Sequence, residues 1–436
     1  MADPALVTVL LFGGLFVLLA LGTPIAFALG GFGALLIAVL WSPGALNMVP
    51  MRAFEATSSF QFLAIPLFIF MASTLQRSGI AQALYDTMQT WVGTLRGGLA
   101  VGTILICTLF AAMAGISGAA TIAMGMLAVP AMMERGYAKR IALGSVAAGG
   151  SLGILIPPSV TMIVYGLVSG TSIGRLYAGG ILPGLLIAGF FIVYLLLRGY
   201  LQPALAGGQS LQRYALRTKL ISLKGLVVPL ALVVGVLGSI LGGLASVTEA
   251  ATVGAAGALG ATIVQGRFTL GMLREICDEV LRLSCMIFWI VIGASALSTF
   301  YTAAGATRFI EGIVLGLDVD PYLILAGILL ILLALGMVLD TVGIIMITAP
   351  IVVPIVTKLG FDPVWFGILY IVMMEIGFLT PPFGYNLFYL RGVSPPSVTM
   401  GDIYRSVLPF VALMLLATAV MVAVPEIILF LPELMF

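Results

Sequence analysis

The chain has 436 residues, of which 61% are hydrophobic and only 8% are charged, with a formal net charge of +2. A soluble domain carries roughly a quarter charged residues, so the composition excludes a soluble protein and indicates a polytopic membrane protein. The chain has no histidine, which excludes Ser-His-Asp triads and His-ligated zinc or haem. It also lacks the G-x-x-x-x-G-K-[ST] motif of ATP-binding P-loops. Uphill work must therefore use an ion gradient or a partner.

The first half contains apolar stretches of about the 20 residues that a membrane-spanning helix needs. A stretch between two basic loops, which lie on the same side of the membrane, can form a re-entrant hairpin that turns inside the membrane. A Pro-Pro pair within a stretch breaks the helix there. The predicted elements are, in order, two crossings in residues 5–40, a crossing at 60–76, a re-entrant hairpin at about 99–133, a helix at about 141–169 broken at Pro157-Pro158, and a crossing at 178–197.

A basic segment, residues 198–224, separates the two halves of the chain. It contains five basic residues and no acidic one. The positive-inside rule places such a segment in the cytoplasm. The basic residues are Arg198, Arg213, Arg217, Lys219 and Lys224.

Glycine and proline positions recur at one gap-free offset of 224 residues. The offset predicts two structural repeats, 1–197 and 225–436. Equivalent loops differ in charge: residues 76–97 hold two basic and one acidic residue (+1), whereas residues 301–321 hold one basic and three acidic residues (−2). The repeats are therefore predicted to be inverted, with both termini outside. The matching pairs include Gly30/Gly254, Gly33/Gly257, Pro130/Pro354, Gly136/Gly360, Gly153/Gly377, Pro157/Pro381 and Pro158/Pro382.

The second half is predicted to repeat this plan, with a hairpin at about 322–357 that turns near Asp340-Thr341. A broken helix follows at about 364–390, interrupted at Pro381-Pro382. The predicted fold is all-α, with about five crossings, one hairpin and one broken helix in each repeat. Inverted repeats with broken helices are typical of secondary transporters, whose site lies at mid-membrane where the breaks meet.

The chemistry concentrates at the two hairpin turns and the two Pro-Pro breaks. Proline leaves backbone carbonyls without a helical partner, which a hard cation such as Na⁺ can supply together with Ser and Thr hydroxyls. Helix starts beyond a break present amides that suit a carboxylate. The predicted Na⁺ ligands are Ser117, Gly118, Ala119, Gly153, Ile154, Pro157, Asp340, Thr341, Gly377, Thr380 and Pro382, and the predicted substrate contacts are Thr121, Ser159, Phe383 and Asn386.

These sites have simpler interpretations, which stay open. A Pro-Pro pair can be a packed kink, although two copies in register favour a functional break. An acidic residue inside a membrane is costly and therefore suggests a functional role. A structural role stays open, because Asp340 can cap a helix and Glu249 and Glu375 can bond neighbouring backbone or an Arg. Arg52 and Glu55 are interpreted as interfacial anchors rather than substrate contacts.

With these residues in view, the sequence resembles the large membrane subunit of tripartite ATP-independent periplasmic (TRAP) transporters, the DctM-like family. The resemblance covers the whole chain. Ala119 is a departure, because the family commonly has a second serine there, which leaves one side-chain oxygen fewer at the hairpin turn. The motifs are residues 62–69 (FLAIPLFI), 116–118 (ISG), 135–137 (RGY), 153–159 (GILIPPS), 248–251 (TEAA) and 377–382 (GFLTPP).

The resemblance implies a Na⁺-coupled importer of small organic acids, such as C4-dicarboxylates, keto acids or sugar acids, in the bacterial inner membrane. It implies two partners, a periplasmic substrate-binding protein and a small four-helix membrane subunit, and an elevator motion within the lipid bilayer. It implies neither an enzyme nor a nucleic-acid partner. The main alternative is a stand-alone dicarboxylate exchanger that needs no binding protein. A subunit of a respiratory complex would have a line of buried Lys and His residues, and a passive channel would have a polar stripe along several helices. The sequence shows neither pattern.

Overall fold

The structure is a computed structural model that describes residues 3–207 and 214–436, so the predicted basic residue Arg213 lies outside the described residues. Within these ranges the regular secondary structure is helical, and the β pairing is one isolated bridge between Tyr137 and Ala206. Eight helices in the described part are long and apolar enough to cross a membrane. The prediction of an all-helical polytopic membrane protein is therefore confirmed.

The first half, to the end of the described residues before the gap, forms eleven α-helices. π-helical segments at Ala28–Phe32 and Ile37–Trp41 flank α3. The helices are α1 (Pro4–Ala20), α2 (Ile25–Phe27), α3 (Gly33–Leu36), α4 (Met48–Ser58), α5 (Ala64–Arg77), α6 (Ile80–Val92), α7 (Gly98–Ala114), α8 (Ser117–Glu134), α9 (Lys139–Ser151), α10 (Val160–Ser169) and α11 (Ile173–Leu201).

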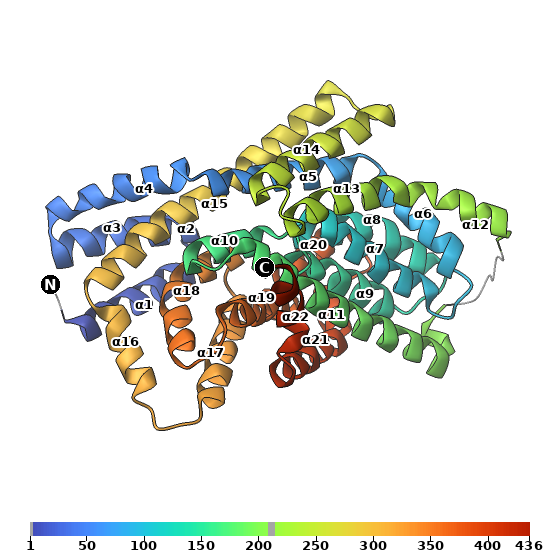
Figure 1. Cartoon of the computed structure of the whole chain (residues 1–436). Coiled ribbons are helices and arrows are strands. Elements are labelled where there is room, and N and C mark those ends of the chain that lie inside the picture. Colours follow the sequence, from blue (N-terminus) through green and yellow to red (C-terminus); the bar gives the residue numbers. More distant parts are fainter. Residues whose placement is uncertain (1–2, 208–213) are drawn as a thin grey trace.

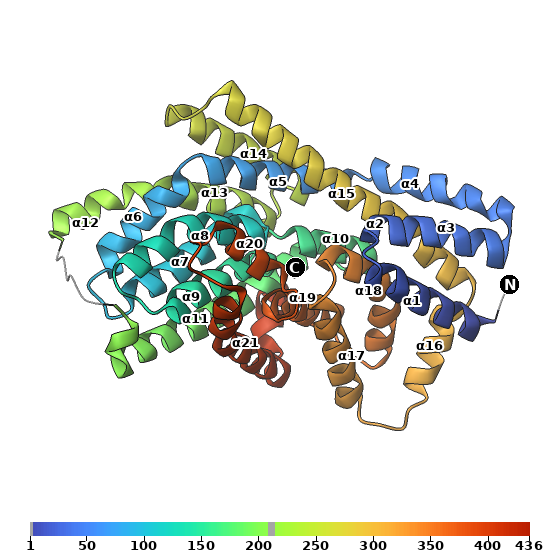
Figure 2. The ribbon, with the colours of Figure 1, turned by 180° about the vertical axis from the view of Figure 1, so that it is seen from behind.

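The rest of the chain forms a second series of helices, in which α15 is the longest, with 34 residues. Figure 1 and the reverse view in Figure 2 both show α15 running alongside α4 and α5. The helices are α12 (Leu216–Ser222), α13 (Lys224–Leu241), α14 (Val247–Val264), α15 (Leu270–Ala303), α16 (Ala306–Leu315), α17 (Pro321–Gly336), α18 (Thr341–Lys358), α19 (Pro363–Leu379), α20 (Tyr385–Val393), α21 (Met400–Ala423) and α22 (Glu426–Met435).

Helix boundaries recur at the offset seen in the sequence. The helices α8 and α18 each have 18 residues and begin 224 positions apart, at Ser117 and Thr341. The helices α9 and α19 also begin 224 positions apart, at Lys139 and Pro363. Each half has a cis Pro-Pro bond, at Pro157-Pro158 and at Pro381-Pro382. The inverted orientation of the two halves stays a prediction.

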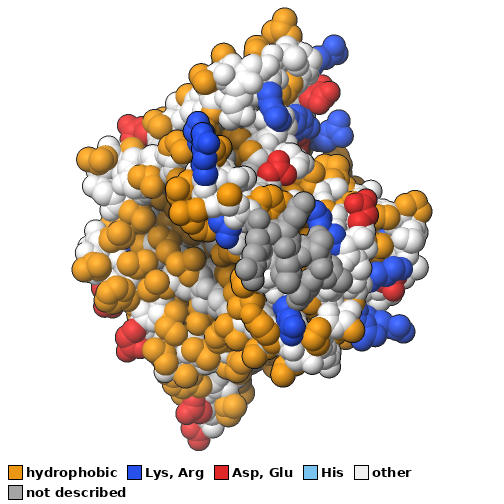
Figure 3. All heavy atoms as spheres, turned by 90° about the vertical axis from the view of Figure 1, so that its right-hand side faces the viewer, with side chains coloured by type: hydrophobic (Ala, Val, Ile, Leu, Met, Phe, Trp, Pro, Cys, Tyr) orange, Lys and Arg blue, Asp and Glu red, His pale blue; other side chains and the backbone are white. Residues whose placement is uncertain are grey.

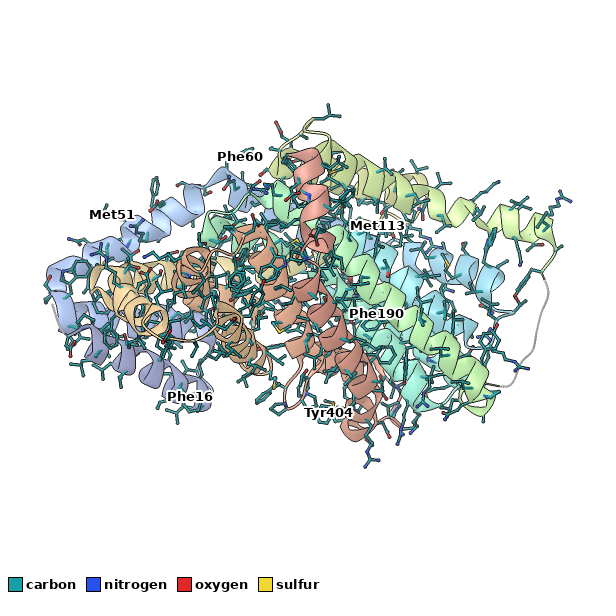
Figure 4. The ribbon with its side chains drawn as sticks, turned by 60° about the horizontal axis from the view of Figure 1, so that its bottom comes forward. Phe16, Met51, Phe60, Met113, Phe190 and Tyr404 are labelled. Atoms are coloured by element: carbon teal, nitrogen blue, oxygen red, sulfur yellow. The ribbon has the colours of Figure 1, made fainter. Side chains whose placement is uncertain are left out.

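Large apolar side chains cover much of the outer surface, as expected where a helix faces lipid. Phe16 is 74% exposed and Met51 is 70% exposed, and both lie at the periphery of the structure, whereas Met113 is buried in its interior (Figure 4). Lys and Arg side chains gather on parts of the face shown in Figure 3, the end of the molecule where α12 lies. The apolar surface and the basic end together fit a protein that spans a bilayer.

Candidate functional site

A cavity of about 390 Å³ lies where the two predicted hairpin turns meet the helices α5 and α15. Its wall includes the starts of α8 and α18, which the sequence places 224 residues apart. The break before α10 contributes a further part of the wall. Of the predicted site residues, those that line the cavity are Ser117, Gly118, Ala119, Ile154, Asp340 and Thr341.

The first hairpin turn packs closely against the first broken helix. Gly115 has a φ of +66°, and a Cβ atom there would lie 2.6 Å from the carbonyl oxygen of Pro158. A Cβ on Gly153 would lie 2.9 Å from the carbonyl oxygen of Ile116. Glycine is therefore required at both positions by backbone contact, and at Gly115 also by the left-handed conformation. These contacts bring the start of α8 beside the break.

The start of α8 is left open toward the cavity. No side chain caps it, because the N-cap position is occupied by Ile116. Ser117 is only 3% exposed, and its hydroxyl has no hydrogen-bond partner among the described residues. The start of a helix carries unpaired amides and the positive end of the helix dipole. This end of the cavity can therefore offer a hydroxyl and backbone amides to a ligand.

The start of α18 is capped instead by a carboxylate. Asp340 Oδ2 accepts a hydrogen bond from the Val342 amide at 3.0 Å, and Thr341 beside it is 6% exposed. The capping role considered for Asp340 is thus present in the structure. Because Asp340 also lines the cavity, its carboxylate brings negative charge to the same space that the open start of α8 faces.

At both Pro-Pro breaks, a nearby hydroxyl satisfies a carbonyl that was expected to be free. Ser159 Oγ donates to the Ile154 carbonyl at 2.5 Å and also caps α10. Thr380 Oγ1 donates to the Ile376 carbonyl at 2.7 Å. The Pro382 carbonyl accepts from the Tyr404 hydroxyl at 2.7 Å. Pro157, Gly153, Gly377, Thr380 and Pro382 do not line the cavity.

The predicted substrate contacts also lie outside the cavity lining. Thr121 and Asn386 are both fully buried, and Thr121 Oγ1 donates to Asn386 Oδ1 at 2.5 Å. Asn386 Nδ2 donates to the Ala147 carbonyl at 2.7 Å. This network joins α8, α9 and α20, which lie together in Figure 2. Phe383 is 51% exposed. The Ser159 hydroxyl already donates to the Ile154 carbonyl at the first Pro-Pro break.

Replacing Asn386 with Ala is expected to destabilise the protein. The change leaves the buried Thr121 hydroxyl without its partner, at a cost of about 1–3 kcal/mol, and it removes a second hydrogen bond to the Ala147 carbonyl, which keeps its bond within α9. We expect a lower apparent melting temperature in detergent by size-exclusion fluorescence, with the Na⁺ concentration for half-maximal uptake unchanged in the folded fraction. A shift in that Na⁺ concentration with no loss of stability would show that Asn386 acts on the ligand.

Three acids discussed above have local partners. Glu375 is fully buried on α19, and its Oε1 accepts from Ser151 Oγ at 3.0 Å, while its Oε2 has no partner among the described residues. Ser151 and Glu375 are 224 residues apart, so equivalent positions of the two halves touch. Glu249 forms a capping box with Ser246 at the start of α14. Glu55 pairs with Arg52 at 2.5 Å.

Sequence reasoning missed the cavity wall that α5 and α15 provide. Ser73 and Gln76 on α5 and Glu279 on α15 line the cavity, as do Tyr385 and Tyr389 on α20. The Arg77–Glu279 ion pair joins sequence positions 202 residues apart, a separation that local patterns do not reveal. A signal was available in the acid at position 279, because an acid within a long, largely apolar helix is costly unless it is paired.

Residues 12–427 match the family described as the DctM component of the tripartite ATP-independent periplasmic transporter. The chain belongs to the DctM family. It is 35% identical to the C4-dicarboxylate TRAP transporter large permease protein DctM of Pseudomonas aeruginosa, over 93% of this chain and 94% of that protein. It is also 35% identical to the isethionate TRAP transporter permease protein DctMQ of Oleidesulfovibrio alaskensis, over 96% of this chain and 65% of that protein.

A solved structure shares the fold of this DctM-family chain. The YdaH transporter of Alcanivorax borkumensis aligns with a TM-score of 0.65 at 14% identity, covering 92% of this chain and 96% of that one. At this identity the likeness shows the fold alone. The family match over residues 12–427 and the similarity to large-permease relatives confirm the resemblance to the TRAP family that the sequence motifs indicated. These relatives are transporters and not enzymes.

Proposed function

We propose that this DctM-family chain is the membrane-embedded subunit of a Na⁺-coupled importer of small organic acids. The observation that carries the proposal is the single cavity that joins the open start of α8 to the Asp340-capped start of α18. The Asp340 carboxylate and the hydroxyls of Ser117 and Thr341, which line the same cavity, suit Na⁺, and the open amides at the start of α8 suit an organic acid. The acids named for the two relatives, C4-dicarboxylates and isethionate, are small anions of this class.

The energetics of Na⁺ coupling are sufficient for accumulation of an anion. A membrane potential of 100 mV contributes about 2.3 kcal/mol per Na⁺, and a tenfold gradient contributes about 1.4 kcal/mol more. Two Na⁺ ions would therefore supply roughly 7 kcal/mol. The shared boundaries of α8 with α18 and of α9 with α19 support two structural repeats, and the opposite charge of their equivalent loops supports their inversion. We propose that the hairpin-bearing part moves as an elevator.

The proposal includes two partners and an orientation in the bacterial inner membrane. Family membership supports a small membrane subunit and a periplasmic substrate-binding protein. The basic segment around α12 is placed in the cytoplasm, and both termini outside. The face in Figure 3 that carries gathered Lys and Arg side chains then meets the cytoplasm.

Omission of single components tests the tripartite assignment. Proteoliposomes would contain the chain alone or with its small subunit, with or without added binding protein, and uptake from a mixture of succinate, isethionate and 2-oxoglutarate would be read by mass spectrometry. We expect uptake only when all three components and an inward Na⁺ gradient are present. Equal uptake by the chain alone would instead identify the stand-alone exchanger.

A further inference from the structure

An ion-pair cluster between α5 and α15 stands at the wall of the central cavity, and none of the ligand roles assigned above uses it. Arg77 Nη1 donates to Glu279 Oε2 at 2.6 Å and to Ser73 Oγ at 2.7 Å. Arg77 Nε lies 3.4 Å from Glu275 Oε2, and Ser73 Oγ donates to Glu279 Oε2 at 2.7 Å. Ser73 and Glu279 line the cavity itself. The cluster therefore places a guanidinium directly behind a lining carboxylate.

The charges around the cavity make this guanidinium significant. The ionisable carboxylates among its described lining residues are Asp340 and Glu279, and no Lys or Arg is among them. An organic acid that enters meets these like charges, so it needs a positive partner besides the coupling cation. Arg77 is the basic side chain bonded to this lining.

The hydrogen bonds of Arg77 leave part of its guanidinium available. Those described use Nε and Nη1, and none of them uses Nη2. The Arg77 side chain is 29% exposed. The free Nη2 carries two N–H donors, so a further acid group would be bound through Nη2 alone and not through the paired donors of the fork. Arg77 can therefore bind a second carboxylate while Glu279 and Ser73 hold it in place.

We propose that Arg77 binds the anionic group of the transported acid, a carboxylate or a sulfonate, at this wall, and that Glu279 and Ser73 position its guanidinium. The inference rests on the proposed function, since it assigns the anion-binding residue of that cavity. Glu279 competes with the acid for Arg77, so removing the charge of Glu279 strengthens acid binding, whereas removing that of Arg77 weakens it. If the Arg77–Glu279 ion pair served only to hold α5 against α15, the two substitutions would not shift acid binding in opposite directions.

The test measures affinity on the vesicle lumen side, where the binding protein plays no part. One acid at a time (succinate, isethionate or 2-oxoglutarate) is loaded inside the vesicles at increasing concentration. The initial rate of uptake of the same acid from outside is then measured with all three components present. The readout is the half-inhibitory concentration, the internal concentration that halves this rate. Arg77→Gln is expected to raise it about tenfold, which corresponds to about 1.4 kcal/mol. Arg77→Lys raises it less, because it keeps the positive charge and loses only the Nη2 donors.

Matched variants separate binding from structure. Glu279→Gln is expected to lower the half-inhibitory concentration, and Arg96→Gln, at an exposed position in the α6–α7 turn, leaves it unchanged. If Arg77→Gln and Glu279→Gln both reduce the maximal rate and neither shifts the half-inhibitory concentration, Arg77 is structural and the inference is overturned. If wild type takes up none of the three acids, the proposed function fails first. If Arg77→Gln does not fold, Arg77→Lys takes its place. The inference then requires that Arg77→Lys raises the half-inhibitory concentration and that Glu279→Gln lowers it.

Discussion

Replacing Asp340 with Asn is expected to raise the Na⁺ concentration for half-maximal uptake about tenfold or more, while the melting temperature stays that of wild type. The charge is lost, but Asn caps a helix about as well as Asp, so the hydrogen bond to the Val342 amide keeps an acceptor. Asp340→Ala removes both the charge and the cap, and it is expected to cost a further ~1 kcal/mol of stability. Uptake against Na⁺ concentration and thermal unfolding measure the two effects separately.

This pair of variants separates the two roles of Asp340. If capping is its whole contribution, Asp340→Asn transports with the Na⁺ dependence of wild type and only Asp340→Ala is impaired. Ser117→Ala serves as a companion, because its hydroxyl lines the cavity at the opposite helix start and has no partner among the described residues. It is expected to weaken Na⁺ activation without a change in melting temperature.

Replacing Gly377 with Ala is expected to separate α17 from α19 and to remove most folded protein. A Cβ atom there would lie 2.6 Å from the Gly336 carbonyl carbon and 2.7 Å from its Cα. These are backbone atoms, which cannot rotate away as a side chain can, so the cost lies at or above the 1–3 kcal/mol typical of overpacking. Size-exclusion fluorescence of the expressed variant and its melting temperature measure the loss.

Two glycines on α17 give a graded control for this prediction. A Cβ on Gly336 would lie 3.3 Å from the Gly377 Cα, a tighter contact than usual but not a clash, whereas a Cβ on Gly327 would meet nothing within 4 Å. We expect the damage to fall in the order Gly377→Ala, Gly336→Ala, Gly327→Ala, with the last as stable as wild type or more so, since Ala favours helix. Equal stability of all three variants would contradict the packing described.

Proline and glycine mark several helix ends in this sequence. The segment expected as a hairpin at about 99–133 contains α7 and α8, and the one at about 322–357 contains α17 and α18; that each pair turns inside the membrane stays a prediction. The Pro-Pro breaks fall between α9 and α10 and between α19 and α20. Proline and glycine constrain the backbone locally, which is why their positions can be read without tertiary information.

The site was less predictable, because side-chain partners come from tertiary packing. The carbonyls at the breaks were expected to need a cation, yet Ser159 and Thr380 bond two of them from within one or two helical turns. Thr121 and Asn386 meet across 265 residues, and Arg77 meets Glu279 across 202. No spacing rule reveals such pairs. Residue type indicated which groups could bind a ligand, and only packing shows which of them face the cavity.

The central claim is that Na⁺ entry drives acid uptake through this chain, and a paired flux measurement tests it most directly. Proteoliposomes with all three components would be held at a fixed membrane potential, and acid uptake and ²²Na⁺ entry would be recorded together under inward gradients of Na⁺, K⁺ or H⁺. We predict accumulation only with Na⁺, and ²²Na⁺ entry that depends on the acid. Equal accumulation under K⁺ or H⁺, without acid-dependent ²²Na⁺ entry, would contradict the claim.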